Sequence, residues 1–289
     1  MESVLGVDKN APLPKFVSST FMDTFKPDPP TDGKRVVLFV TCFANNNRPS
    51  IGHATVRLLR AAGVGVEACF PACCGMPQLE SGLVGEVALS AKKISEQLLP
   101  YVEQGCKVVA LTPSCALMLR QEWPLLLPED ASVRRVSEAA VDASECIDTL
   151  IKEGRLKPSA DLKEAAVVTL HSACHSRAQN VGLKSKEILS AMPNVRVNVI
   201  ERCSGHGGTW GFENYETALK VGGPVFAKAL EDKGKAKASG VKHYVTSDCP
   251  LAAKHVLDGM TKGEENSVKD ESAAEMHPVE IFAKYYFKD

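Results

Sequence analysis

The segment "RVVLFVTCF", residues 35 to 43, decides how the rest of the chain is interpreted. It is short, apolar and rich in β-branched residues, which is typical of a strand buried on both faces of a parallel sheet. Cys42 stands near the carboxyl end of this predicted strand. A helical pattern, "HATVRLLRAAG" at 53–63, follows and stops on a glycine. Strand, cysteine and helix therefore form one unit of the sequence.

The same order of strand, cysteine and helix recurs along the chain. Further strands are predicted at 64–70, 107–115, 165–175, 195–205 and 242–250, with helical stretches between them. Alternating strands and helices are typical of an α/β fold with a parallel sheet. Each of the predicted strands runs into a cysteine near its carboxyl end.

The spacing of these cysteines indicates an internal duplication. The separations from Cys42 to Cys174, from Cys73 to Cys203 and from Cys115 to Cys249 are 132, 130 and 134 residues. Such agreement predicts two duplicated Rossmann-like modules, each a small, mostly parallel sheet with flanking helices. Ligands of open parallel sheets sit at the carboxyl ends of the strands, so the cysteines of each module are expected to share one crevice.

The predicted domain boundaries follow from this duplication. We expect an extended proline-rich arm at 1–33, a first module at 34–150 and a second module at 151–289. The second module includes a polar stretch at 261–278, which we expect to be a solvated loop. The arm, with its five prolines and little periodicity, is expected to lie across a surface, and the arm and tail are candidate partner-binding segments.

The stretch "CFPACCGMP", residues 69 to 77, points to the chemistry of the first module. Adjacent side chains point in different directions, so two neighbouring cysteines fill a core poorly. An iron–sulfur cluster typically takes four thiolates, which need not be close in sequence. The candidate ligands are Cys42, Cys73, Cys74 and Cys115, with Cys69 as a possible fifth thiol.

The second module departs from this pattern, because Ser204 follows Cys203 where the first module has a second cysteine. The candidate metal ligands here are Cys174, Cys203 and Cys249, with His206 or His175 as a fourth. Three thiolates and an imidazole can hold an iron–sulfur cluster or a single zinc or iron ion. Alternatively, this module is a scaffold without metal, or the whole cysteine set binds zinc and only stabilises the fold.

Other residues fit structural roles. Cys106 and Cys146 are expected to be plain buried thiols, and Trp123, Trp210 and Tyr215 to be packing residues. No GxGxxG motif follows the first predicted strand, so a dinucleotide site is not expected.

Composition excludes several classes of protein. The chain has 289 residues with 34 Lys and Arg against 35 Asp and Glu, which argues against binding nucleic acid. No apolar run approaches the roughly 18–20 residues of a membrane-spanning helix. Ten cysteines without an export signal suggest reduced thiols recruited for metal. We expect a protein that is not secreted and that lies in the cytoplasm or on the mitochondrial matrix side, soluble or peripheral to a membrane.

Four stretches together resemble the cysteine-rich CCG-domain proteins. They are "CCGMP", "HSACHSRAQN", "CSGHGGTWGFENYETALKVGGPVF" and "SDCPLA". This group includes the B-subunit of heterodisulfide reductase, lactate-utilisation proteins and the C-subunit of anaerobic glycerol-3-phosphate dehydrogenase, whose C-terminal part the chain resembles most. The resemblance implies a 4Fe–4S cluster or a non-cubane variant on the four first-module cysteines. Met118, Ser204 and Ala252 stand where many relatives carry cysteines.

The resemblance also implies a function. It is an iron–sulfur electron-transfer subunit of an oxidoreductase complex, relaying electrons between a flavoprotein dehydrogenase and a quinone or other acceptor. The implied partners are that dehydrogenase and a ferredoxin-like subunit, through which the protein would associate with a membrane. Two alternatives are an enzyme that itself reduces a heterodisulfide or quinone, and a non-redox, metal-stabilised assembly subunit of a respiratory complex.

Overall fold

The computed structural model describes residues 6–29, 33–158, 164–263 and 273–288. The chain divides into two compact units. The first unit contains Phe16–Lys157 and His175–Lys184, and the second contains Met1–Lys15, Pro158–Cys174 and Ser185–Asp289.

The first unit is built on a four-stranded, all-parallel sheet in the order β2–β1–β3–β4. Its strands are β1 (Arg35–Phe39), β2 (Gly65–Cys69), β3 (Lys107–Ala110) and β4 (Ala140–Asp142). The two central strands are almost entirely buried, as expected of strands covered on both faces by helices. Their apolar, β-branched sequences satisfy that requirement.

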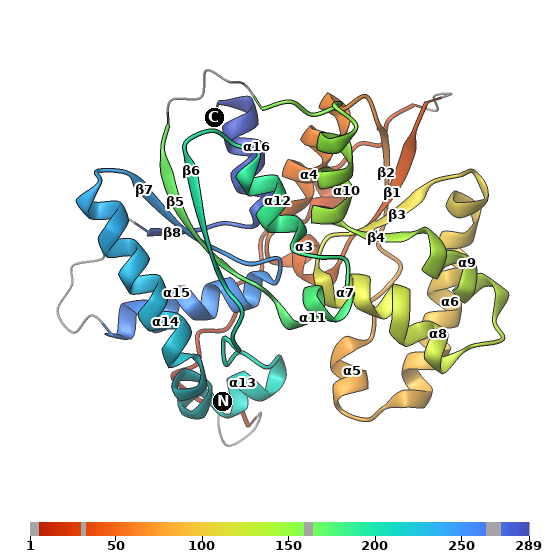
Figure 1. The fold of residues 1–289 in the computed structure, drawn as a ribbon. Coiled ribbons are helices and arrows are strands. Elements are labelled where there is room, and N and C mark those ends of the chain that lie inside the picture. The colour runs from red at the N-terminus through yellow and green to blue at the C-terminus, as the bar shows by residue number, and fades with distance from the viewer. Residues whose placement is uncertain (1–5, 30–32, 159–163, 264–272, 289) are drawn as a thin grey trace. The chain divides into compact units, whose positions relative to one another are not determined.

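Helices cover both faces of this sheet. They are α3 (Cys42–Asn46), α4 (Pro49–Ala61), α5 (Met76–Glu80), α6 (Val84–Glu103), α7 (Pro113–Leu117), α8 (Trp123–Leu126), α9 (Ala131–Ala139) and α10 (Ala143–Lys152). Between α7 and α8 lies one π-helical turn, η1 (Met118–Glu122). Helix α6 packs beside α9 on one face, and α4 packs beside α10 on the other (Figure 1).

The second unit repeats this topology. Its four parallel strands lie in the order β6–β5–β7–β8, which is the order of the first sheet. The strands are β5 (Ala166–His171), β6 (Val195–Ile200), β7 (Lys242–Thr246) and β8 (Ala273–Glu275). The predicted α/β fold of two duplicated modules is therefore confirmed, and each sheet is entirely parallel.

The helices of the second unit also follow the repeat. In chain order the helices after β5 are α11 (Cys174–Ala178), of which all but Cys174 belongs to the first unit, and then α12 (Lys184–Ser190), α13 (Thr209–Glu213), α14 (Tyr215–Ala238), α15 (Pro250–Gly263) and α16 (Pro278–Phe287). Helix α14 packs beside α15, as α6 does beside α9, and both contact β7. Figure 1 shows α12 and α16 on the other side of this sheet.

The strands end earlier than the apolar runs suggest, because helices begin next to the cysteines. Strand β1 ends at Phe39, and the hydroxyl of Thr41 then accepts a hydrogen bond from Ala44 N as the cap of α3. Strand β3 ends at Ala110, and Pro113 stands in the first turn of α7, where its missing N–H costs nothing. Cys42 and Cys115 therefore lie in the first turns of helices.

The proline-rich arm contributes to the core of the first unit. Residues 21–24 form a short helix, α2 (Phe21–Thr24), whose capping box joins Thr20 and Asp23. Phe21 is fully buried, and its ring stacks on Phe25 with a centroid distance of 5.2 Å. The arm thus does more than cross a surface, because it delivers one aromatic side chain to the interior.

The tail forms a helix, and the described ends of the polar stretch before it belong to a helix and a strand. Helix α16 is mostly buried, and the His277 ring caps its first turn by accepting a hydrogen bond from Val279 N. Of the polar stretch at 261–278, residues 261–263 belong to α15 and 273–275 form β8, while 264–272 lie outside the described residues. Within the described parts of the chain, no helix is both long and apolar enough to cross a membrane.

Candidate metal centre

Four thiols of the first unit lie in contact at the carboxyl edge of its sheet. They follow three different strands: Cys42 comes after β1, Cys73 and Cys74 after β2, and Cys115 after β3. Cys42 is hydrogen-bonded to Cys73, and Cys73 to Cys74. The Cys115 and Cys74 sulfurs in turn lie within hydrogen-bond distance, 3.2 Å apart. The structure thus brings together the four cysteines that the sequence singled out.

The loop that holds the adjacent pair has an unusual backbone. Gly75 caps α5 with a φ of +89°, a left-handed conformation that a residue with a Cβ adopts only under strain. The carbonyl of Cys74 accepts a hydrogen bond from the indole N–H of Trp123 at 3.0 Å. Turn geometry and this hydrogen bond fix where the two sulfurs point.

Exposure varies across the four thiols. Cys74 and Cys115 are buried in the apolar core of the unit, Cys73 is half-buried and Cys42 is exposed. The site is therefore enclosed by protein on one side and open to solvent at Cys42. An inorganic group held here would be shielded from water except along that edge.

The electrostatics of the four thiols favour one negative charge at Cys73. Hydrogen bonds from the Cys42 and Cys74 thiols lower the pKa of Cys73, and the amides of Gly75 and Cys74 lower it further. The hydrogen bond to Cys73, with burial, raises the pKa of Cys42. Hydrogen bonds to Cys115 and Cys73, with burial, raise the pKa of Cys74. A thiolate is the form that binds metal, so Cys73 is already prepared to act as a ligand.

The donor set fits an iron–sulfur cluster. Four thiols meet in one place, with a thiolate and two backbone amides among them, which is the ligand chemistry such clusters use. The sulfurs touch each other directly, so a cluster would separate them. Among the residues that the structure describes, no group of three or more His, Cys, Asp and Glu side chains has the arrangement of a site for one metal ion.

Three other cysteines of the first unit lie elsewhere. Cys69 ends β2 beside Tyr101, and burial raises its pKa. Cys106 is almost fully buried in the core. Cys146 lies on α10, where burial raises its pKa to about 12. Their raised pKa values are those of inert, structural thiols.

In the second unit, two of the predicted ligands are close. Cys174 begins α11 after β5, and Cys249 precedes α15 after β7. Burial raises the pKa of Cys249 to about 11, and the nearby Cys174 thiol raises it as well. These two residues are the counterparts of Cys42 and Cys115.

Cys203 lies in a loop whose glycine has the same left-handed backbone conformation as the glycine of the first-module loop. It is exposed, and its sulfur accepts a hydrogen bond from Gly205 N at 3.4 Å. Gly205 has a φ of +83°, close to that of Gly75. A Cβ at Gly205 would lie 2.0 Å from the Ala218 carbonyl oxygen, so this loop packs directly on α14. Ser204, which is buried, stands where the first loop has Cys74. The two loops diverge after the glycine, because α5 begins at Met76 whereas Gly207 and Gly208 have positive φ before α13 begins.

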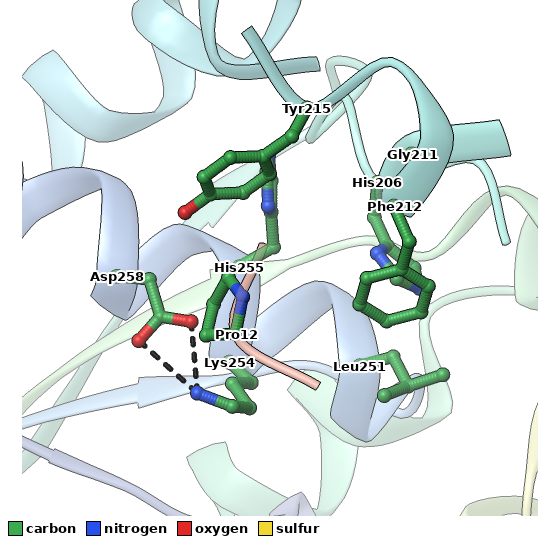
Figure 2. Close-up of a pocket in the computed structure, with 9 residues that line it drawn as sticks. All are labelled: Pro12, His206, Gly211, Phe212, Tyr215, Leu251, Lys254, His255 and Asp258. Atoms are coloured by element: carbon green, nitrogen blue, oxygen red, sulfur yellow. Dashed lines mark hydrogen bonds and ion pairs between the residues drawn. The ribbon is translucent and has the colours of Figure 1, made fainter. Parts of the chain in front are cut away.

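His206 faces a small pocket in the second unit (Figure 2). Its ring is buried 5.9 Å from that of His255, and its Nε2 has no hydrogen-bond partner among the described residues. Burial lowers the pKa of His206 to about 4, so the ring is neutral at pH 7. The other lining residues are Pro12, Gly211, Phe212, Tyr215, Leu251, Lys254 and Asp258.

His175, the other predicted histidine ligand, belongs to the first unit rather than the second. It is half-buried, and its surroundings include the carboxylates of Glu80 and Glu122. Burial lowers its pKa. The structure therefore sets His175 among first-unit side chains, and it aims His206 at the ring of His255.

The sequence did not reveal the contact that Trp123 makes with the cysteine loop. The residue was expected to serve packing alone, and it does pack, edge-on against Phe39 at 6.5 Å. Its bond to the Cys74 carbonyl depends on the π-helical turn η1, which has no recognisable signal in the sequence.

Fold and site together define a class of protein: duplicated parallel α/β modules with cysteines after consecutive strands. Residues 36–120, which contain all four clustered cysteines, match the family model described as a cysteine-rich domain, CCG. The resemblance expected from the sequence is confirmed by this match.

Curated relatives extend the likeness over most of the chain. It is 28% identical over 242 residues to the C-subunit of anaerobic glycerol-3-phosphate dehydrogenase of Escherichia coli K12, and the match spans 81% of this chain but only 60% of the relative's length. It is 29% identical over 227 residues to lactate utilization protein A of Bacillus pumilus, and the match covers 74% of this chain and 87% of that protein. It is 26% identical over 240 residues to an uncharacterized iron–sulfur protein of Methanococcus maripaludis, and the match covers 79% of this chain and 42% of that protein.

Proposed function

We propose that this protein is an iron–sulfur electron-transfer subunit of an oxidoreductase complex, with one cluster on Cys42, Cys73, Cys74 and Cys115. The observation that carries the proposal is the contact of these four thiols, which arrive from three strand ends. The match of 36–120 to the cysteine-rich family, and a relative named as an iron–sulfur protein, support it.

The chain's own residues would bind and shield the cluster. Cys73 is the most acidic of the perturbed thiols and so would bind iron first, while Cys74 and Cys115 hold the buried side. The amides of Cys74 and Gly75 face the Cys73 sulfur and favour negative charge there. When bound, a cluster of this kind supplies one-electron transfer at a potential set by such hydrogen bonds and by burial.

The exposed edge at Cys42 is where we propose that electrons pass to and from partner proteins. By the likeness to the glycerol-3-phosphate dehydrogenase C-subunit, these partners would be a flavoprotein dehydrogenase and a ferredoxin-like subunit. The same exposure favours one alternative, an enzyme whose cluster reduces a disulfide or a quinone directly. Adding a disulfide or a quinone to the reduced protein distinguishes the electron-transfer subunit from the enzyme. Only the enzyme's visible spectrum should change when no partner protein is present.

We propose that the second module has a metal centre of its own on Cys174, Cys203 and Cys249. Cys174 and Cys249 are neighbours, and Cys203 stands in the loop whose left-handed glycine matches that of the first-module loop. His206 would have to turn away from His255 to join them. Metal bound to a Cys73→Ser/Cys74→Ser double variant would show that this second site exists.

The cluster assignment is tested by single cysteine variants purified without oxygen. We expect Cys73→Ser and Cys74→Ser each to abolish the thiolate-to-iron absorbance near about 400 nm. Cys146→Ser is the matched control, since this thiol lies on α10, and should leave the absorbance unchanged. Equal absorbance in all three variants would refute the assignment.

A further inference from the structure

The peptide bond between Cys74 and Gly75 has both of its polar groups engaged. Its carbonyl accepts the hydrogen bond from Trp123 Nε1 at 3.0 Å. Its N–H, which belongs to Gly75, faces the Cys73 sulfur. In a planar trans peptide these two groups point in opposite directions. Holding the carbonyl on one side therefore aims the amide at the sulfur on the other.

The π-helical turn η1 makes this contact possible. Cys115 in α7 and Trp123 in α8 are eight residues apart, and both touch Cys74. In a regular α-helix, eight residues turn through about 800°, which leaves the two side chains about 80° apart. A π-helical turn contains one extra residue, so the pair behaves as if seven apart and lies within about 20° of one face.

Side chains around η1 stabilise the turn. The backbone carbonyl of Arg120 accepts a hydrogen bond from the Ser137 hydroxyl at 2.8 Å. The guanidinium of Arg120 forms an ion pair with the Glu145 carboxylate. Trp123 itself is fully buried, and its ring meets Phe39 at an interplanar angle of 87°. The indole is thereby held in one orientation, which a directed hydrogen bond requires.

We propose that Trp123 is a positioning residue for the four-cysteine site: its indole fixes the Cys74–Gly75 peptide so that the Gly75 amide stays on the Cys73 sulfur. The effect on a cluster rests on the function proposed above, whereas the peptide orientation does not. An amide donating to a ligand sulfur stabilises the more negative, reduced cluster and raises its potential. Loss of the indole donor should lower that potential.

The first test needs no metal. Exchange of the Gly75 amide is followed by NMR in the metal-free, reduced protein and in Trp123→Phe, which keeps an aromatic ring and removes the donor. We expect the Gly75 amide to exchange about tenfold faster in the variant. That factor corresponds to the loss of one hydrogen bond to a charged group, here from the Gly75 amide to the Cys73 thiolate. Trp210→Phe, which removes the exposed indole of the second unit and leaves Trp123 in place, should leave the exchange unchanged. Equal acceleration in both variants would overturn the proposal.

The native protein supplies a measurement that stands even where Trp123→Phe does not fold. The chain has two tryptophans, and Trp210 is 45% exposed. Trp210→Phe assigns the two indole signals. The Trp123 N–H should exchange much more slowly than that of Trp210, and a fast Trp123 indole would contradict the hydrogen bond.

The second test uses the cluster-loaded protein. Its reduction potential should be lower in Trp123→Phe than in the wild type, and unchanged in Trp210→Phe. A potential equal in all three proteins would overturn the tuning role. A protein without iron would refute the proposed function but would leave the metal-free result standing, so the two failures are distinguishable.

Discussion

Thr169, Asp232 and His243 form a buried hydrogen-bonded network in the second unit. The Thr169 hydroxyl donates to Asp232 Oδ2 at 2.9 Å and lies 2.9 Å from His243 Nε2. Since the hydroxyl gives its proton to the carboxylate, the proton between Thr169 and His243 must be carried by Nε2. Burial lowers the pKa of His243 to about 4, although the charge of Asp232 opposes the shift, so the ring is neutral at pH 7.

The stability of the protein should therefore fall in mild acid. The unfolded chain takes up a proton on this histidine below about pH 6.5, whereas the folded protein does so only near pH 4. Between these values the unfolded state binds more protons and is therefore stabilised relative to the folded state. We expect this residue to remove about 2 kcal/mol from the free energy of unfolding between pH 7 and pH 5. Denaturant unfolding at the two pH values measures the loss.

His243→Gln provides the comparison, because its amide can still donate to Thr169 and does not titrate. The variant should lose about 2 kcal/mol less than the wild type between the two pH values. The same loss in both proteins would show that His243 does not cause it. His206, whose pKa is also lowered to about 4, contributes equally to both proteins.

At the scale of elements, the short helix α2 anchors the N-terminal arm. Phe21 packs against Phe25, and against the His53 ring on α4 at a centroid distance of 5.0 Å. Gly52 makes room for it, because a Cβ there would lie 2.6 Å from the Phe21 ring. The Asp28 carboxylate then accepts a hydrogen bond from Val66 N, which fixes the arm to β2.

We expect Phe21→Ala to lower the free energy of unfolding by about 3–5 kcal/mol, because it leaves a cavity in a closed core. Phe16→Ala is the matched control, since Phe16 is 81% exposed, and should change stability by no more than about 0.5 kcal/mol. Chemical denaturation measures both. Similar values for the two variants would mean that the arm is not part of the folded unit.

Much of this element pattern could be predicted. The six longer strands are apolar and β-branched, so their period and their glycine-terminated helices identify them. Strands β4 and β8 were missed because each has only three residues, is paired with a single neighbouring strand and ends on an acidic residue. The arm's role was missed because one phenylalanine, without periodicity, places it in the core.

In the candidate site, too, some features could be predicted from the sequence and others could not. The meeting of Cys42, Cys73, Cys74 and Cys115 follows from parallel topology, since all four come after carboxyl ends of neighbouring strands. The orientation of His206 could not be predicted, because its ring packs against Phe212, six residues on, and against His255, which is distant in the sequence. The contact of Trp123 with Cys74 depends on a helix irregularity, and helical periodicity would have placed that side chain elsewhere.

At the scale of the whole molecule, the two modules share a topology but differ at the site. Both have the same strand order and the same left-handed glycine after the second strand. The first keeps a complete set of four thiols in contact. In the second, Ser204 takes the place of one thiol and His206 faces a pocket. The two modules therefore share a scaffold, and the set of four contacting thiols lies in the first.

The content of iron and acid-labile sulfide in anaerobically purified protein tests this account most directly. One ordinary cluster on the first-module cysteines predicts about four of each per chain, and a brown protein. A colourless protein, free of both iron and sulfide after anaerobic purification and reconstitution, would contradict it.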